Sequence, residues 1–188
     1  YKKIYQTSNQ FNSMKKYVLT GGPCAGKTSV LLELKKRGYS IVSETARELI
    51  AKEQKNNGNN LPWINLKKFQ ETVAKKQLEK ELKLDKTKEY FLDRGIADGI
   101  AYFKAEDLDP PESLIELAKK NRYDKIFLLS RLKLHKTDSE RKETPNQAEK
   151  IHKSIKEVYS NLGYKVIEIP ALNVRERVKL ILDKIKNN

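Results

Sequence analysis

The sequence has few features that could cross-link the chain or anchor it in a membrane. Its 188 residues include one cysteine, Cys24, which excludes an intramolecular disulfide, and no group of Cys and His has the spacing of a zinc site. No run of about 18 apolar residues is present, so no segment is predicted to span a membrane. The start of the chain lacks the apolar core of a signal peptide. We therefore expect a cytoplasmic protein that binds no zinc.

The sequence has fewer acidic than basic residues. The sequence has 39 Lys and Arg against 25 Asp and Glu, which gives a formal net charge of +14. Such an excess favours anionic partners: nucleotides, polyphosphates, nucleic acid or an acidic membrane surface. Basic and acidic residues are interleaved along the expected helices without an aromatic stacking motif, which disfavours nucleic acid. Contact with a membrane surface stays open on charge alone.

Short β-rich segments alternate with helical patterns along the chain. The expected strands are 17–20, 39–42, 90–92, 125–129 and 165–169. Helices are expected between these strands and after the last one, with Ser43 and Asn65 as caps of two of them. This alternation predicts an α/β fold with a parallel sheet of about five strands and helices on both faces. Ligands of such sheets bind at the carboxyl ends of the strands.

The first residues differ from the rest of the chain. Residues 1–13 are polar and precede Met14, the only methionine. We interpret residues 1–13 as an N-terminal extension and residues 14–188 as one nucleotide-binding, kinase-like domain. The sequence leaves open whether the extension is native.

Residues 21–28, with the sequence GGPCAGKT, match the phosphate-loop pattern in full. Its glycines allow the backbone to wrap a phosphate with N–H groups pointing inward, and the following helix adds its positive end. Lys27 would contact the outer phosphates, and the Thr28 hydroxyl would hold Mg²⁺. Cys24 is interpreted as a small filler rather than a redox group. The loop predicts a three-layer P-loop NTPase fold. The residues expected to bind nucleotide are Gly22, Pro23, Cys24, Ala25, Gly26, Lys27, Thr28 and Ser29.

Two acidic residues stand at the ends of expected strands. Asp93 follows the third strand and could hold Mg²⁺ or accept a proton, while Arg94 could clamp a phosphoryl group. Glu44 follows the second strand and is the other candidate base, with Arg47 as a substrate contact. The structural alternative is that the acids cap helices and the arginines form surface ion pairs.

Three further positions are candidates with weaker support. Gln70 and Gln77 are seven positions apart on one face of an expected helix, where their amides could read a base or sugar. Both could equally be rim residues. Within the charged stretch 131–145, Arg141 could act on the transition state from a basic flap. A solvated loop is the alternative there, and His152 is expected at the surface.

The order of these motifs resembles a known family, the P-loop AAA domain family that includes the ribosylnicotinamide kinase domain of the bacterial NAD regulator. The resemblance covers about Met14 to Ile185 and includes LTGGPCAGKTS at 19–29, SETARE at 43–48 and FLDRG at 91–95 with Asp98. It implies a pattern close to nucleoside and nucleotide kinases. In deoxynucleoside kinases an acid after the second strand is the base, and an acid–arginine pair follows the third strand. Asp98 joins the expected substrate site on this resemblance.

The leading hypothesis is a kinase that transfers the γ-phosphoryl group of ATP, with Mg²⁺, to a small nucleoside-like acceptor. Its catalytic residues would be Lys27, Glu44, Asp93, Arg94 and Arg141. GTP is the alternative donor, although no guanine-reading Asn-Lys-x-Asp motif is present. The alternative function is a nucleotide-dependent switch or NTPase that binds a protein or an anionic lipid, a reading favoured by the net charge.

Overall fold

Five parallel strands form the centre of the protein, which we describe from a computed structural model over residues 14–132 and 143–186. The strands are β1 (Lys15–Thr20), β2 (Ser40–Val42), β3 (Glu89–Asp93), β4 (Lys125–Leu129) and β5 (Val166–Ile169). Their order in the sheet is β2-β3-β1-β4-β5. The predicted α/β fold with a five-stranded parallel sheet is confirmed.

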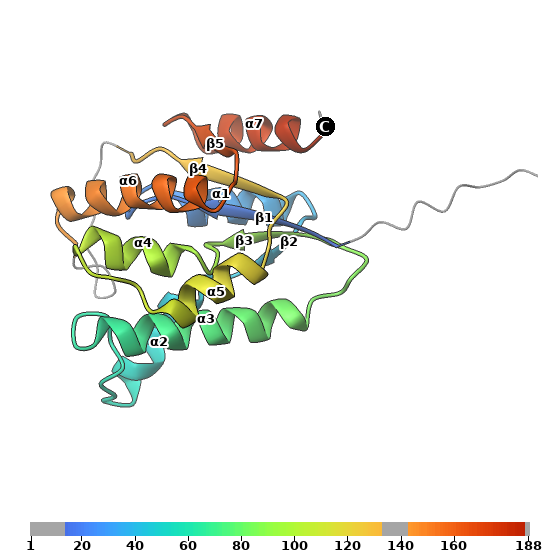
Figure 1. Ribbon diagram of the computed structural model, residues 1–188. Coiled ribbons are helices and arrows are strands. Elements are labelled where there is room, and N and C mark those ends of the chain that lie inside the picture. Colours follow the sequence, from blue (N-terminus) through green and yellow to red (C-terminus); the bar gives the residue numbers. More distant parts are fainter. Residues whose placement is uncertain (1–13, 133–142, 187–188) are drawn as a thin grey trace, which may run out of the picture.

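Helices cover both faces of this sheet (Figure 1). They are α1 (Lys27–Lys36), α2 (Thr45–Lys55), α3 (Leu66–Leu82), α4 (Asp98–Ala105), α5 (Glu112–Lys120), α6 (Pro145–Asn161) and α7 (Val174–Lys186). In Figure 1, α7 lies on one side of the strands, and α3, α4 and α5 lie on the other. In the described part of the chain, no helix is long and apolar enough to cross a membrane.

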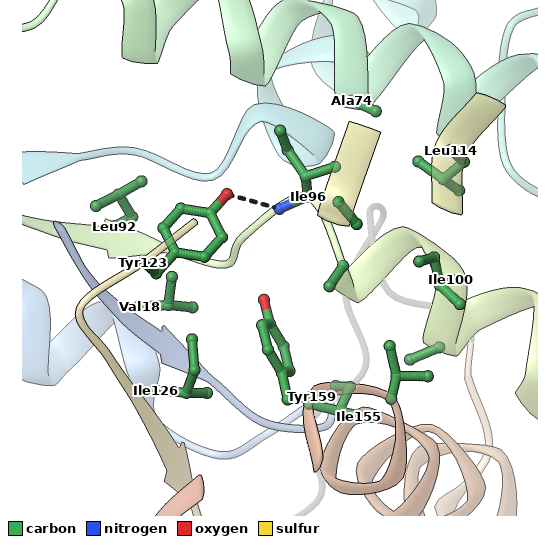
Figure 2. Close-up of a cluster of buried hydrophobic side chains, with 14 of the residues drawn as sticks. Val18, Ala74, Leu92, Ile96, Ile100, Leu114, Tyr123, Ile126, Ile155 and Tyr159 are labelled. Carbon is green, nitrogen blue, oxygen red and sulfur yellow. Dashed lines mark hydrogen bonds between the residues drawn. The ribbon is translucent and has the colours of Figure 1, made fainter. Parts of the chain in front are cut away.

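The alternation of side chains along the strands divides the core into two layers. On one face, Val18, Leu92 and Ile126 pack against residues of α4 and α6 such as Ile100 and Ile155 (Figure 2). On the other face, neighbouring strand residues including Leu19, Phe91 and Phe127 pack against α1 and α7. A smaller cluster joins α2 to α3. The sheet is therefore buried on both faces, which fixes the carboxyl ends of its strands relative to one another.

Side-chain hydrogen bonds cap the first turns of α3 and α6, whereas α1, α2, α4 and α5 begin without a side-chain cap. The Asn65 side chain accepts a hydrogen bond from the Lys68 N–H at 3.0 Å, as predicted. Ser43 is not a cap, because α2 begins one residue later than expected and the Ser43 hydroxyl bonds the Glu48 side chain instead. The helix expected between the strands at 125–129 and 165–169 is α6, which begins at Pro145, where Thr144 and Gln147 form a capping box.

Candidate functional site

The phosphate loop follows β1 and leads directly into α1. Gly21 has φ +143°, and a Cβ there would lie 2.6 Å from the Leu129 carbonyl oxygen, so only glycine fits. Cys24 is buried with φ 62°, a left-handed conformation that holds the bend of the loop. Lys27 is buried, and its ammonium donates to the Gly21 carbonyl at 3.0 Å. Thr28 and Ser29 are exposed at the start of α1.

Four charged residues meet at the carboxyl ends of β2 and β3, and we call them the carboxyl-edge cluster: Glu44, Asp93, Arg94 and Asp98. The Arg94 guanidinium donates from Nε to Glu44 at 2.7 Å and from Nη1 to Asp98 at 3.0 Å. Arg47 lies 3.1 Å from the second oxygen of Glu44. Glu44 and the Asp93–Arg94 pair are therefore brought together from separate strands, as their positions after β2 and β3 suggested.

The backbone at Arg94 is shaped to make this contact. Arg94 has φ 72°, and its N–H donates to the Leu19 carbonyl at 3.0 Å. At the next position, a Cβ on Gly95 would lie 2.6 Å from the Tyr159 hydroxyl, so the turn requires a glycine. A left-handed conformation at a non-glycine residue persists only where its surroundings enforce it.

The two candidate bases have opposite electrostatic environments. Burial and the neighbouring charge of Glu44 raise the pKa of Asp93 to about 6. Burial also acts to raise the pKa of Glu44, but the positive charges of Arg94 and Lys27 outweigh it and lower that pKa to about 2. Glu44 is consequently ionised throughout the neutral pH range, whereas the pKa of Asp93 lies close to that range.

Asp98 lines the cavity described below, and both of its carboxylate oxygens are bonded within the protein. Its Oδ1 accepts from the Thr20 hydroxyl at 2.5 Å and from Arg94 at 3.0 Å. Its Oδ2 accepts from the Tyr159 hydroxyl at 2.7 Å and the Gly95 N–H at 3.1 Å. With both oxygens engaged and 3% of the residue exposed, Asp98 orients Arg94.

A cavity of about 480 Å³ opens beside the carboxyl-edge cluster, between α2, α3 and α4. Its walls include Phe69, Trp63 and Tyr102, and Pro23 connects it to the phosphate loop. Arg47 and Gln70 also line the cavity, and their contact with a substrate stays a prediction. Gln70 is 5% exposed, and no hydrogen bond joins its amide to another of the described residues. The cavity thus offers aromatic walls and one amide with unused bonding capacity.

Gln77 lines the same cavity but belongs to a second buried group, which we call the amino-edge cluster: Lys16, Gln77, Glu81, Asn121 and Tyr123. Glu81 accepts from Lys16 at 2.7 Å, Asn121 at 2.9 Å, and Gln77 and Tyr123 at 3.0 Å each. The other end of the Gln77 amide accepts from the Thr45 hydroxyl at 2.5 Å. Both ends of the Gln77 amide are therefore bonded within the protein, and its contact with a ligand stays a prediction.

The residues fit a magnesium ion of the type held by phosphate loops. Asp93 Oδ1 is buried and has no hydrogen-bond partner in the described part of the chain, as expected for an oxygen that meets a hydrated ion. Thr28 is exposed at the loop and could supply the second ligand. No cluster of three or more Asp, Glu, His or Cys that could hold a metal occurs within residues 14–132 and 143–186. A phosphate-loop site needs no such cluster, since the nucleotide supplies most ligands.

Two side chains that contact the loop were missed by the sequence reasoning. Arg177 of α7 donates to the Ala25 carbonyl at 2.6 Å, and His152 of α6 accepts from the Gly22 N–H at 3.2 Å. His152 is partly buried rather than at the surface, and burial lowers its pKa. Arg177 had one signal in the sequence, a charged residue among the apolar positions Val174, Val178 and Ile181 of one helix face. Arg141 lies outside the described residues.

The fold and this loop define a P-loop nucleotide-binding domain. The chain belongs to a family described as AAA domain, whose family model matches residues 16–177. Among curated proteins, none matches the chain.

Solved structures of kinases share the fold. Deoxyadenosine kinase from M. mycoides with bound dATP has 19% identity and a TM-score of 0.66, over 92% of this chain and 100% of that one. Thymidylate kinase from Candida albicans has 15% identity and a TM-score of 0.66, over 94% and 92%. The NadR protein in complex with NAD and AMP-PNP has 17% identity and a TM-score of 0.65, over 92% of this chain but 48% of that one.

Proposed function

We propose that this protein is a magnesium-dependent kinase that transfers the γ-phosphoryl group of ATP to a hydroxyl of a small nucleoside-like acceptor. The observation that carries the proposal is the position of the cavity, which Pro23 of the phosphate loop and both candidate bases, Glu44 and Asp93, line together. A donor phosphate at the loop and an acceptor in the cavity would therefore meet at the carboxyl-edge cluster. The likeness in fold to deoxyadenosine kinase with bound dATP and to thymidylate kinase supports the same assignment.

On the donor side, the loop amides and Lys27 would bind the phosphates. Thr28 and Asp93 would hold magnesium, which when bound would neutralise charge on the β- and γ-phosphates. β3 is the direct neighbour of β1 in the sheet, with Leu19 paired to Asp93, so the acid lies beside the strand that leads into the loop. ATP is the proposed donor, and GTP is the alternative that a donor screen tests.

On the acceptor side, the ionised Glu44 carboxylate favours a hydroxyl acceptor over a phosphate acceptor. A hydroxyl must lose its proton during transfer, whereas an acceptor phosphate is already largely ionised at neutral pH. In the proposed step, the bond between the γ-phosphorus and the bridging oxygen of ADP breaks, and the bond to the acceptor oxygen forms. The hydroxyl proton passes to Glu44, since Asp93 is assigned to the metal. Arg94 would stabilise charge on the transferred group.

The walls of the cavity favour a flat heteroaromatic group on the acceptor. Phe69, Trp63 and Tyr102 supply apolar and aromatic surface, and the Gln70 amide offers one donor and one acceptor to a base edge. Arg47, at the cavity wall beside Glu44, would contact the substrate near the reacting group.

The test is transfer of label from γ-labelled ATP across a panel of nucleosides, nucleoside-like vitamins and nucleoside monophosphates. We expect labelled product with one hydroxyl acceptor, dependence on magnesium, and loss of transfer in Asp93→Asn. Slow release of phosphate that is independent of acceptor and equal in wild type and Asp93→Asn would contradict the proposal. Nucleotide-dependent binding to anionic vesicles without transfer would favour the switch function that the net charge of +14 allows.

A further inference from the structure

Arg177 is the largest fully buried side chain in the described part of the protein, with 1% of the residue exposed. Its two terminal nitrogens donate to backbone carbonyls: Nη1 to Ala25 at 2.6 Å and Nη2 to Ser130 at 2.9 Å. Its Nε is buried and has no partner among the described residues. Arg177 thus bridges the phosphate loop and the chain that leaves β4.

The charge of Arg177 is unusual because no carboxylate balances it within the described ranges. Arginines this buried are ordinarily paired with an acid, as Arg94 is with Glu44 and Asp98. Burial alone lowers the pKa of Arg177, and no neighbouring charge contributes. An uncompensated cation behind a phosphate loop raises the electrostatic potential at that loop, where a polyphosphate would supply the missing negative charge.

The contact with Ala25 also fixes the direction of a peptide group. In a trans peptide, the carbonyl of one residue and the N–H of the next point in opposite directions. The Ala25 carbonyl points to Arg177, so the Gly26 N–H points away from it. The Leu132 N–H holds the preceding carbonyl, that of Cys24, in the same way at 3.2 Å. The contact to the Cys24 carbonyl therefore orients the Ala25 N–H, and the contact to the Ala25 carbonyl orients the Gly26 N–H.

We propose that Arg177 is a positioning residue of the nucleotide site. It holds the Ala25–Gly26 peptide with its N–H toward bound polyphosphate and adds behind it a positive charge that no carboxylate of the described residues balances. This inference rests on the proposed function only in taking a nucleoside triphosphate as the ligand of the loop. It requires binding of the polyphosphate and does not depend on the acceptor or on transfer.

The test measures binding of a non-hydrolysable ATP analogue and of inorganic pyrophosphate by calorimetry in three variants. Arg177→Met removes the charge and both hydrogen bonds, whereas Arg177→Lys keeps the charge and can reach one carbonyl. Arg175→Met is the matched control, because Arg175 is exposed on the same helix and its loss changes the net charge equally.

We expect Arg177→Met to weaken both probes by about tenfold or more, as for loss of a charge-assisted hydrogen bond, with Arg177→Lys between it and wild type. Arg175→Met should bind as wild type does. If transfer occurs, the KM for ATP should rise in Arg177→Met, while kcat at saturating ATP and the KM for the acceptor stay constant. A purely structural role would not separate these constants.

Unchanged binding in a folded Arg177→Met protein would overturn the inference. Should Arg177→Met fail to fold, Arg177→Lys decides, and wild-type affinity in that variant would overturn it equally. Equal weakening in Arg175→Met and Arg177→Met would also overturn it, because net charge alone would then account for the effect. A wild-type protein that binds pyrophosphate but transfers no phosphoryl group would contradict the proposed function and leave the Arg177 comparison intact.

Discussion

Two buried polar clusters lie at opposite edges of the sheet, and they differ in how completely their groups are bonded. In the amino-edge cluster, the Glu81 carboxylate accepts hydrogen bonds from Lys16, Gln77, Asn121 and Tyr123. In the carboxyl-edge cluster, Asp93 keeps a buried oxygen without a partner among the described residues. The Asp93 pKa is raised, and Arg94 has a left-handed backbone.

This difference teaches that burial and ion pairing do not by themselves indicate a reacting site. Saturated networks stabilise a fold, because each charge has its partner. Groups left incompletely bonded beside a cavity cost stability, and such costs are characteristic of functional sites. We therefore assign chemistry to the carboxyl-edge cluster and a structural role to the amino-edge cluster.

The largest expected effect is on transfer, in Asp93→Asn. Removing the charge that would hold magnesium should lower kcat by about two to four orders of magnitude while the protein stays folded. Steady-state transfer and circular dichroism measure these two quantities. Asp109→Asn, an exposed acid, is the matched control. A wild-type kcat in Asp93→Asn would show that the carboxyl-edge cluster takes no part in the reaction.

Glu81→Gln, in the amino-edge cluster, should lower the stability of the protein. It leaves the Lys16 ammonium buried without its counter-charge, so the free energy of unfolding should fall by about 3 kcal/mol. Denaturant titration measures this loss, with exposed Glu79→Gln as control on the same helix. An unchanged free energy of unfolding would show that the saturated network does not contribute to stability.

The pH dependence of the free energy of unfolding should show how much the ionised Asp93 carboxylate destabilises the folded protein. The pKa of Asp93 in the folded state, about 6, exceeds the ordinary aspartate value of 3.8, so the folded state binds the proton more tightly than the unfolded state. The contribution of Asp93 to stability is therefore full below pH 3.8 and is lost as the pH rises through about 6. Nucleotide-free Asp93→Asn should exceed wild type by about 1–3 kcal/mol at pH 7. A difference in free energy of unfolding between Asp93→Asn and wild type that stays constant from pH 4 to pH 7 would contradict a raised Asp93 pKa.

The smallest expected effect concerns the wall of the cavity. Gln70→Leu is nearly isosteric and removes the amide that faces the acceptor, so the KM for the acceptor should rise about tenfold with little change in kcat. Initial rates over a range of acceptor concentrations measure both constants. An equal fall in kcat with constant KM would instead place Gln70 in the chemical step.

The phosphate loop could be predicted from the sequence because its determinants are contiguous: a strand, a glycine-containing turn and a helix. Glu44 and Asp93 could also be predicted, because parallel strands bring their carboxyl ends to one edge. The hydrogen bonds that occupy Asp98 and the acceptor end of Gln77 could not be predicted, since they come from Tyr159 and Thr45, which lie on helices distant in sequence. Arg177 was missed because its two partners are backbone carbonyls, which leave no charge pattern.

Single-turnover transfer from γ-labelled ATP, compared in wild type, Glu44→Gln and Glu81→Gln at a temperature where all three are folded, tests the central claim most directly. Glu44→Gln removes the proposed base from the carboxyl-edge cluster, and Glu81→Gln makes the same change in the amino-edge cluster. We expect Glu44→Gln to lose about two orders of magnitude or more in the transfer rate and Glu81→Gln to keep the wild-type rate. Equal rates in all three proteins, or a loss confined to Glu81→Gln, would contradict the central claim.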